Sequence, residues 1–162
     1  MTAETMMKEY GAMKKELAVL EFQISHFTGV SENDVIVSML YGRHDDTERV
    51  QTSNISDKTA SIAMNYRKVM ARENDEWFEF LWDRYRYVKE EVEFFETVIR
   101  YLPEELSGII QDMISGGLSW EEIADKYHIS RASVGNYRKN AVKQLNEAYR
   151  LRDMTQEAFM LS

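Results

Sequence analysis

The sequence predicts an all-α protein, and three observations lead to this class. The 162-residue chain has one proline and seven glycines, too few turn formers for a many-stranded β architecture. Apolar residues recur at three- and four-residue spacing along most of the chain, which is the period of an α-helix. Hydrophobic residues make up 44% and charged residues 30%, the balance of a folded chain. We expect an N-terminal bundle or coiled coil of long helices, followed by a short multi-helix domain.

Two amphipathic helices are predicted in the first forty residues. The first covers about 6–27 and ends near Gly29; its apolar stripe is Leu17, Leu20, Ile24 and Phe27. The second starts after Ser31, an N-cap residue type, and closes at Gly42. Residues 42–55 are polar and lack a helical period, so they predict a loop.

A long helical region follows from Ser56, the predicted N-cap, although the pattern weakens around residues 73–75. From Trp77 to Leu102 the apolar residues alternate at four and three: Trp77, Leu81, Tyr85, Val88, Val92, Phe95, Ile99 and Leu102. Such a heptad seam packs against a partner helix at a shallow angle. That partner is either residues 17–27 and 62–69 of the same chain or a second chain, which would make a homodimer.

Three further helices are predicted between Leu102 and Arg152. Pro103 suits the first helical position, and Gly116 and Gly117 end that helix. Ser119 with Glu122 forms a capping box for a helix over 120–126. A tight turn at 127–129 leads to a third helix, capped by Ser130.

This pattern divides the chain into three predicted segments. Residues 1–101 form an acidic helical region for oligomerisation or partner binding, residues 102–152 form a separate domain, and residues 153–162 form a C-terminal tail. Residues 1–101 contain nineteen acidic and thirteen basic side chains, whereas 130–145 contain four basic and no acidic ones. The whole chain has a net charge of −8, so basic character is confined to a short segment.

The second and third of these helices have the features of a helix-turn-helix. Ile123 and Ala124 form the apolar-small pair where the helices cross, Ile129 is the apolar turn residue, and Val134 locks the third helix onto the second. The segment LPEELSGIIQDMISGGLSWEEIADKYHISRASVGNYRKNAVKQL resembles region 4 of bacterial sigma factors. It resembles still more closely the phage and mobile-element activators of the RinA and ArpU type. The preceding long-helix region, residues 50–102, is similar to the corresponding part of those regulators, with less motif content.

The resemblance implies a transcription regulator that binds double-stranded DNA through the helix starting at Ser130. The base-facing positions of the family correspond to Arg131, Ala132, Gly135 and Asn136. Arginine suits guanine and asparagine suits adenine, whereas Ala132 and Gly135 offer no side-chain hydrogen bond. Phosphate contacts are expected from Ser133, Lys139, Asn140 and Lys143, and Ser130 and Arg138 are also expected among the DNA-binding residues. His128 occupies the turn position where glycine is common in the family.

Other classes of function have little support in the sequence. There is no cysteine, the three histidines lie far apart, and no nucleophile motif or glycine-rich phosphate loop is present, so we expect no enzyme activity, metal or cofactor. No apolar run is long enough to cross a membrane, which predicts a cytoplasmic protein without a membrane partner. The alternative function is an adaptor that binds RNA polymerase or phage packaging proteins and has little DNA affinity of its own.

Overall fold

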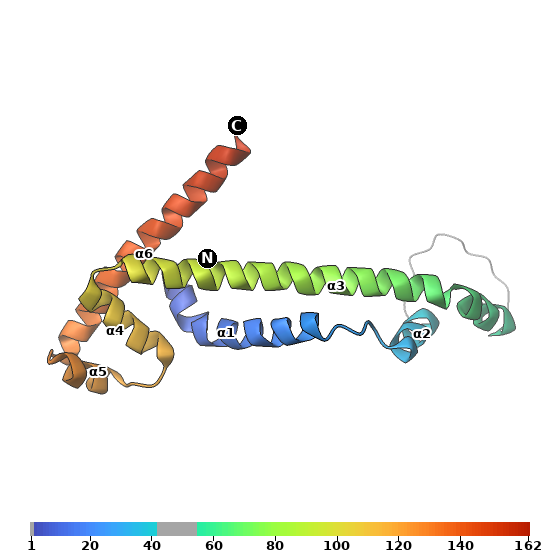
Figure 1. Cartoon of the computed structure of the whole chain (residues 1–162), viewed down its shortest axis with the longest axis horizontal. Helices are drawn as coiled ribbons and strands as arrows, with labels where there is room; N and C mark the ends of the chain where they lie inside the picture. The colour runs from blue at the N-terminus through green and yellow to red at the C-terminus, as the bar shows by residue number, and fades with distance from the viewer. Residues whose placement is uncertain (1, 42–54) are drawn as a thin grey trace. The chain divides into compact units, whose positions relative to one another are not determined.

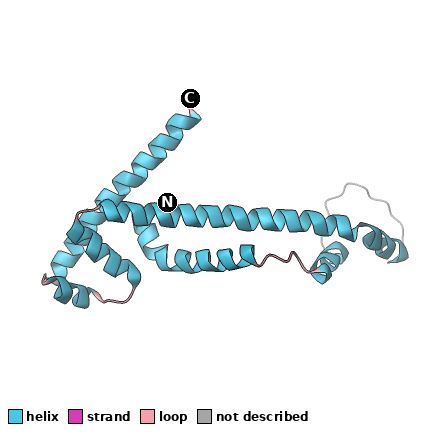
Figure 2. Cartoon of the chain, in the orientation of Figure 1, coloured by secondary structure: helices cyan, strands magenta, loops and turns pink. Residues whose placement is uncertain are grey.

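Helices are the only regular elements in the residues that the computed structural model describes, 2–41 and 55–162 (Figures 1 and 2). They are α1 (Ala3–Ser25), α2 (Glu32–Tyr41), α3 (Ile55–Tyr101), α4 (Glu104–Ser115), α5 (Trp120–Tyr127) and α6 (Arg131–Met160). The all-α prediction is confirmed for this part of the chain. The predicted loop, apart from Ile55, lies outside the described residues. Among the helices that are described, none has a stretch that is both long and apolar enough to span a bilayer.

The chain forms two compact units, and their boundaries differ from those of the three predicted segments. Unit 1 combines Met1–Val19 with Arg86–Ser162, and unit 2 is Leu20–Tyr85. Helices α1 and α3 each contribute to both units. This division could not be predicted, because the helical period of the sequence continues without a break across both boundaries.

Unit 2 has a small core in which α2 and parts of α1 and α3 take part. Leu20, Val35 and Leu81 are buried, and Phe27 packs edge-on against Phe78 with ring centroids 5.1 Å apart. The Asn74 side-chain oxygen accepts a hydrogen bond from the Val30 backbone N–H at 2.7 Å. The weak period at 73–75 therefore marks a polar inward contact, and α3 runs through it.

Helix α3 also starts earlier than expected. It begins at Ile55, so Ser56 lies inside its first turn, and the prediction of Ser56 as N-cap is wrong.

Six of the eight heptad residues are buried within the single chain: Leu81, Val88, Val92, Phe95, Ile99 and Leu102. Trp77 is 40% exposed and Tyr85 is half-buried. In unit 1 the partner is the first part of α1, which runs antiparallel to α3 (Figure 1). Tyr10 packs against Phe95 at 5.7 Å between ring centroids and donates a hydrogen bond to Glu96 at 2.7 Å. The predicted partner began at residue 17, so the earlier turns of α1 were missed.

Two predicted boundaries in the C-terminal half need correction. Pro103 is the N-cap of α4, with ψ 140°, and the helix begins at Glu104. The extended backbone at Pro103 places it just before the helix, where its missing N–H is still not needed. Residues 153–160 are not a separate tail, because α6 continues as one 30-residue helix to Met160.

Candidate nucleic-acid interface

A tight turn joins α5 to α6 and fixes how the two helices meet. The hydroxyl of Ser130 accepts a hydrogen bond from the Ser133 N–H at 3.1 Å, which confirms Ser130 as the N-cap of α6. His128 adopts the left-handed conformation, with φ 54°, and the Ile129 N–H bonds to the Ala124 carbonyl at 3.0 Å. At this position an L-residue costs about 1–2 kcal/mol, which glycine would avoid.

The start of α5 is fixed in a similar way. The Glu122 N–H donates to the Ser119 hydroxyl at 3.2 Å, and the Ser119 N–H donates to the Glu122 carboxylate at 2.7 Å. The predicted capping box is therefore confirmed. The hydrogen bond from the Ser119 backbone is the main cause that lowers the pKa of Glu122.

A small apolar core holds α4, α5 and α6 together. Ile109 of α4, Ile123 and Ala124 of α5, and Val134 of α6 form one buried cluster. Partly buried apolar side chains surround this cluster: Met113, Leu118, Tyr127, Ile129 and Tyr137. The residues expected to lie at the crossing of α5 and α6 thus face the core. The opposite face of α6 is exposed to solvent.

Polar contacts between α4 and α5 reinforce this core. Asp112 of α4 accepts hydrogen bonds from the Lys126 ammonium at 2.7 Å and from the Tyr127 hydroxyl at 2.8 Å. The hydrogen bond with Lys126 is the main cause that lowers the pKa of Asp112, and burial together with Asp112 raises the pKa of Tyr127 to about 12. Gly108 makes room for this tyrosine, since a Cβ at Gly108 would lie 2.7 Å from its hydroxyl oxygen. No pattern in the sequence around Gly108 predicts this requirement.

The predicted DNA-contacting residues lie on one helix, and most of them are open to solvent. Ser130, Arg131, Ala132, Asn136, Lys139, Asn140 and Lys143 are exposed. Ser133 is half-buried, and its hydroxyl lies 2.9 Å from that of Ser130. A DNA backbone could reach the exposed set without displacing any part of the core.

Gly135, the remaining position predicted to face the bases, lies partly against α5. A Cβ at Gly135 would touch the Trp120 ring at 3.7 Å, an ordinary packing distance. Trp120 is 40% exposed and borders the same surface. Trp120 is not among the residues predicted from the sequence, and the available signal was its place directly after the N-cap Ser119, at the first position of α5.

Two arginines of the predicted set already have acidic partners. Arg131 lies 2.9 Å from Glu121, and Arg138, whose side chain is only 26% exposed, lies 3.8 Å from Glu4 of α1. An arginine with a carboxylate partner must exchange it for a base or a phosphate, which weakens the net gain on binding.

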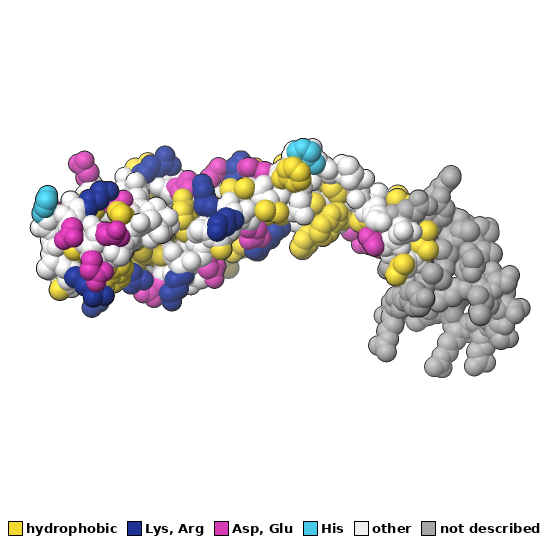
Figure 3. All heavy atoms as spheres, turned by 90° about the horizontal axis from the view of Figure 1, so that it is seen from below, with side chains coloured by type: hydrophobic (Ala, Val, Ile, Leu, Met, Phe, Trp, Pro, Cys, Tyr) yellow, Lys and Arg dark blue, Asp and Glu magenta, His cyan; other side chains and the backbone are white. Residues whose placement is uncertain are grey.

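The charge around this surface is mixed. Residues 102–152 contain seven acidic and seven basic side chains. Basic and acidic side chains are interspersed on the face drawn in Figure 3. Within the described residues, no group of three or more His, Asp or Glu side chains is arranged to hold a metal ion. The side chains that α6 exposes at this surface can form hydrogen bonds and attract oppositely charged groups.

No family model matches the chain, and the comparisons with the curated proteins and with the solved structures found no match.

Proposed function

We propose that this chain is a DNA-binding transcription regulator that reads a promoter or operator through the first half of α6. The observation that carries the proposal is the exposure of Arg131 and Asn136 at the capped start of a helix whose other face is fixed in a core. In helix-turn-helix proteins, that end of the second helix enters the major groove. The unpaired N–H groups of the first turn also favour a nearby phosphate.

The exposed residues divide into two roles by their chemistry. Arg131 can donate two hydrogen bonds to guanine, and Asn136 can pair with adenine, each worth about 1–3 kcal/mol of discrimination. Lys139 and Lys143 lie one and two turns further along α6 and would contact phosphates, which adds affinity without specificity. The likeness to sigma region 4 and to RinA- and ArpU-type activators supports promoter DNA as the target.

A pair of substitutions tests this division of roles. Binding sites are first selected from random DNA fragments, and binding is then measured at several salt concentrations. Arg131→Ala should relax the preference at one base pair. Lys139→Ala should weaken binding to all sequences and reduce the slope of log K against log salt by about one unit.

Lys15→Ala is the matched control, because Lys15 is an exposed lysine on α1. It should leave both specificity and salt slope unchanged. If Arg131→Ala and Lys139→Ala weaken binding to all DNA sequences to the same extent, Arg131 does not recognise a base and its assigned role is wrong. If no DNA is selected at low salt, the proposed function fails.

The second candidate is an adaptor that binds RNA polymerase or phage packaging proteins with little DNA affinity of its own. The balanced charge of residues 102–152 and the acidic partners of Arg131 and Arg138 favour this alternative. Gel shifts on genomic fragments at two salt concentrations separate the candidates. A regulator forms complexes that weaken with salt, whereas an adaptor forms none at either concentration.

A further inference from the structure

The last three turns of α6 carry an apolar surface that no described part of the chain covers. Leu151, Met154, Ala158 and Leu161 follow one another at intervals of three, four and three, so they form one stripe on the helix. Leu151, Met154 and Leu161 are 59%, 54% and 89% exposed. A half-apolar helix in a folded protein normally packs that half against another element.

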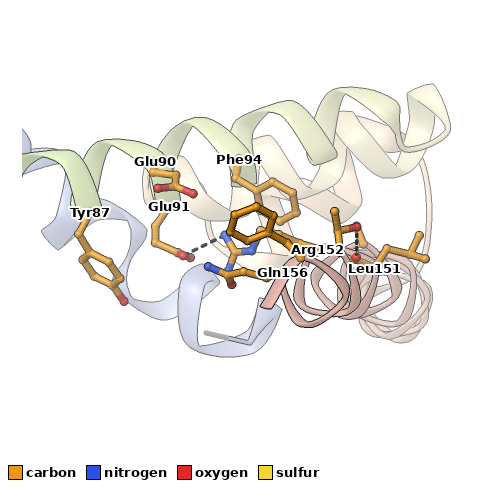
Figure 4. A pocket seen from close by; sticks show the side chains of 10 residues that line it. Tyr87, Glu90, Glu91, Phe94, Leu151, Arg152 and Gln156 are labelled. Atoms are coloured by element: carbon orange, nitrogen blue, oxygen red, sulfur yellow. Dashed lines mark hydrogen bonds and ion pairs between the residues drawn. The ribbon is translucent and has the colours of Figure 1, made fainter. Parts of the chain in front are cut away.

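An apolar groove lies beside this stripe, between α3 and α6 of unit 1. Its volume is about 780 Å³, and Tyr87, Phe94, Leu151 and Phe159 supply its apolar lining. Figure 4 shows Glu91 and Phe94 of α3 pointing toward Arg152 of α6. The groove thus has one wall from α3 and one from the helix that carries the stripe.

Glu91 and Arg152 line the groove, and with the neighbouring Tyr149 they form a polar cluster that is incompletely paired among the described residues. The Arg152 guanidinium lies 4.5 Å from the Phe94 ring centroid, 4.9 Å from that of Tyr149 and 2.9 Å from a Glu91 oxygen. The second Glu91 carboxylate oxygen and the Tyr149 hydroxyl are buried, and neither has a hydrogen-bond partner among the described residues. Such groups are costly unless something satisfies them. Glu90 adds a second carboxylate to the α3 wall.

We propose that the distal part of α6 from a second copy of this chain occupies the groove, and that the two copies do so reciprocally. Stripe and groove adjoin on one helix, so a two-fold arrangement would cover both in each copy. Exposed Arg150 lies at the edge of the stripe, and in the second copy it would meet Glu90, the exposed carboxylate of the α3 wall. An acidic peptide or a DNA backbone would instead place like charges against that wall.

The test measures the oligomeric state of the full chain without DNA, by sedimentation velocity over a wide concentration range. The wild-type chain should dimerise. The double substitution Met154→Glu with Leu161→Glu should raise the dimer dissociation constant by at least about tenfold, because it places charges in the covered stripe. Met160→Glu is the matched control, since Met160 is 78% exposed and lies on the opposite side of the same helix. It should leave the dissociation constant unchanged.

A charge exchange tests the orientation. Arg150→Glu should weaken the dimer, and adding Glu90→Lys should restore it. Both residues are exposed, so neither substitution disturbs the core.

A chain that is monomeric at all concentrations would overturn this inference, and so would a dimer that the stripe substitutions leave intact. Capture of another protein by the stripe of a monomeric chain would count against it as well. The outcome is independent of the proposed function. A monomer that binds DNA contradicts the dimer alone, and a dimer that binds no DNA contradicts the regulator alone.

Discussion

Replacing Gly108 by alanine should destabilise unit 1, although alanine is the better helix former. In a helix interior the change gains about 1 kcal/mol of intrinsic propensity. Here the new Cβ would lie 2.7 Å from the Tyr127 hydroxyl oxygen, too close for the tyrosine to keep its position. The hydroxyl would lose its 2.8 Å hydrogen bond to the Asp112 carboxylate, and a bond to a charged group is worth about 1.5–3 kcal/mol. The expected net loss is therefore about 0.5–2 kcal/mol.

Urea unfolding, followed by circular dichroism, measures this change against two matched variants. Gly11→Ala in α1 has nothing within 4 Å of its new Cβ, so it should stabilise by about 0.5–1 kcal/mol. The Tyr127→Phe background removes the colliding oxygen, while the nearest ring carbons stay at 3.5 Å. In that background Gly108→Ala should become stabilising. The reasoning is refuted if Gly108→Ala raises the free energy of unfolding as much as Gly11→Ala does.

Three further outcomes follow from the α5–α6 region. Glu121→Gln should increase DNA affinity about two- to fivefold in a titration at low salt, because it releases Arg131 from an exposed ion pair. An unchanged affinity would mean that this ion pair does not compete with DNA. His128→Gly should raise the free energy of unfolding by about 1 kcal/mol, since it relieves the left-handed backbone, and a lower urea midpoint would contradict this. The pKa values of Glu122 and Asp112 are lowered in the folded chain, so their stabilisation is present above the unfolded pKa values near 4 and is lost as pH falls through the folded ones. Glu122→Gln keeps the cap but removes one titration, so its thermal midpoint should fall less than that of the wild type between about pH 6 and pH 3; an equal fall would exclude Glu122 as a contributor.

Local signals in the sequence were sufficient for the helices around the candidate site. The cap at Ser130, the capping box at Ser119 and the glycine stop at Gly116 each depend on residues within one turn. The inward positions of Ile123 and Val134 also follow from helical spacing alone. For this reason the start of α6, and the exposure of its first residues, could be predicted.

Contacts between distant parts of the chain could not be predicted in the same way. Nothing near Gly108 indicates that the Tyr127 hydroxyl passes over it, and nothing near Arg138 indicates that it meets Glu4. Similarly, Glu121 looks like a solvated acid until the turn brings it beside Arg131. These pairings form only when the helices pack against one another. They change the electrostatics of the candidate site, but the helix-turn-helix pattern in the sequence is the same with or without them.

The packing of unit 1 also changes what the candidate DNA-binding region consists of. Beyond the α4–α6 core, α6 continues with the buried residues Leu145 and Tyr149. Tyr149 packs edge-on against Phe94 of α3 at 5.0 Å, and Asn146 accepts a hydrogen bond from the Ala3 backbone N–H at 3.0 Å. Because α6 is one continuous helix, the element that carries the candidate DNA-binding surface in its first half also packs against α1 and α3 with its second half. The candidate region therefore includes the packing partners of that second half, and not the α4–α6 core alone.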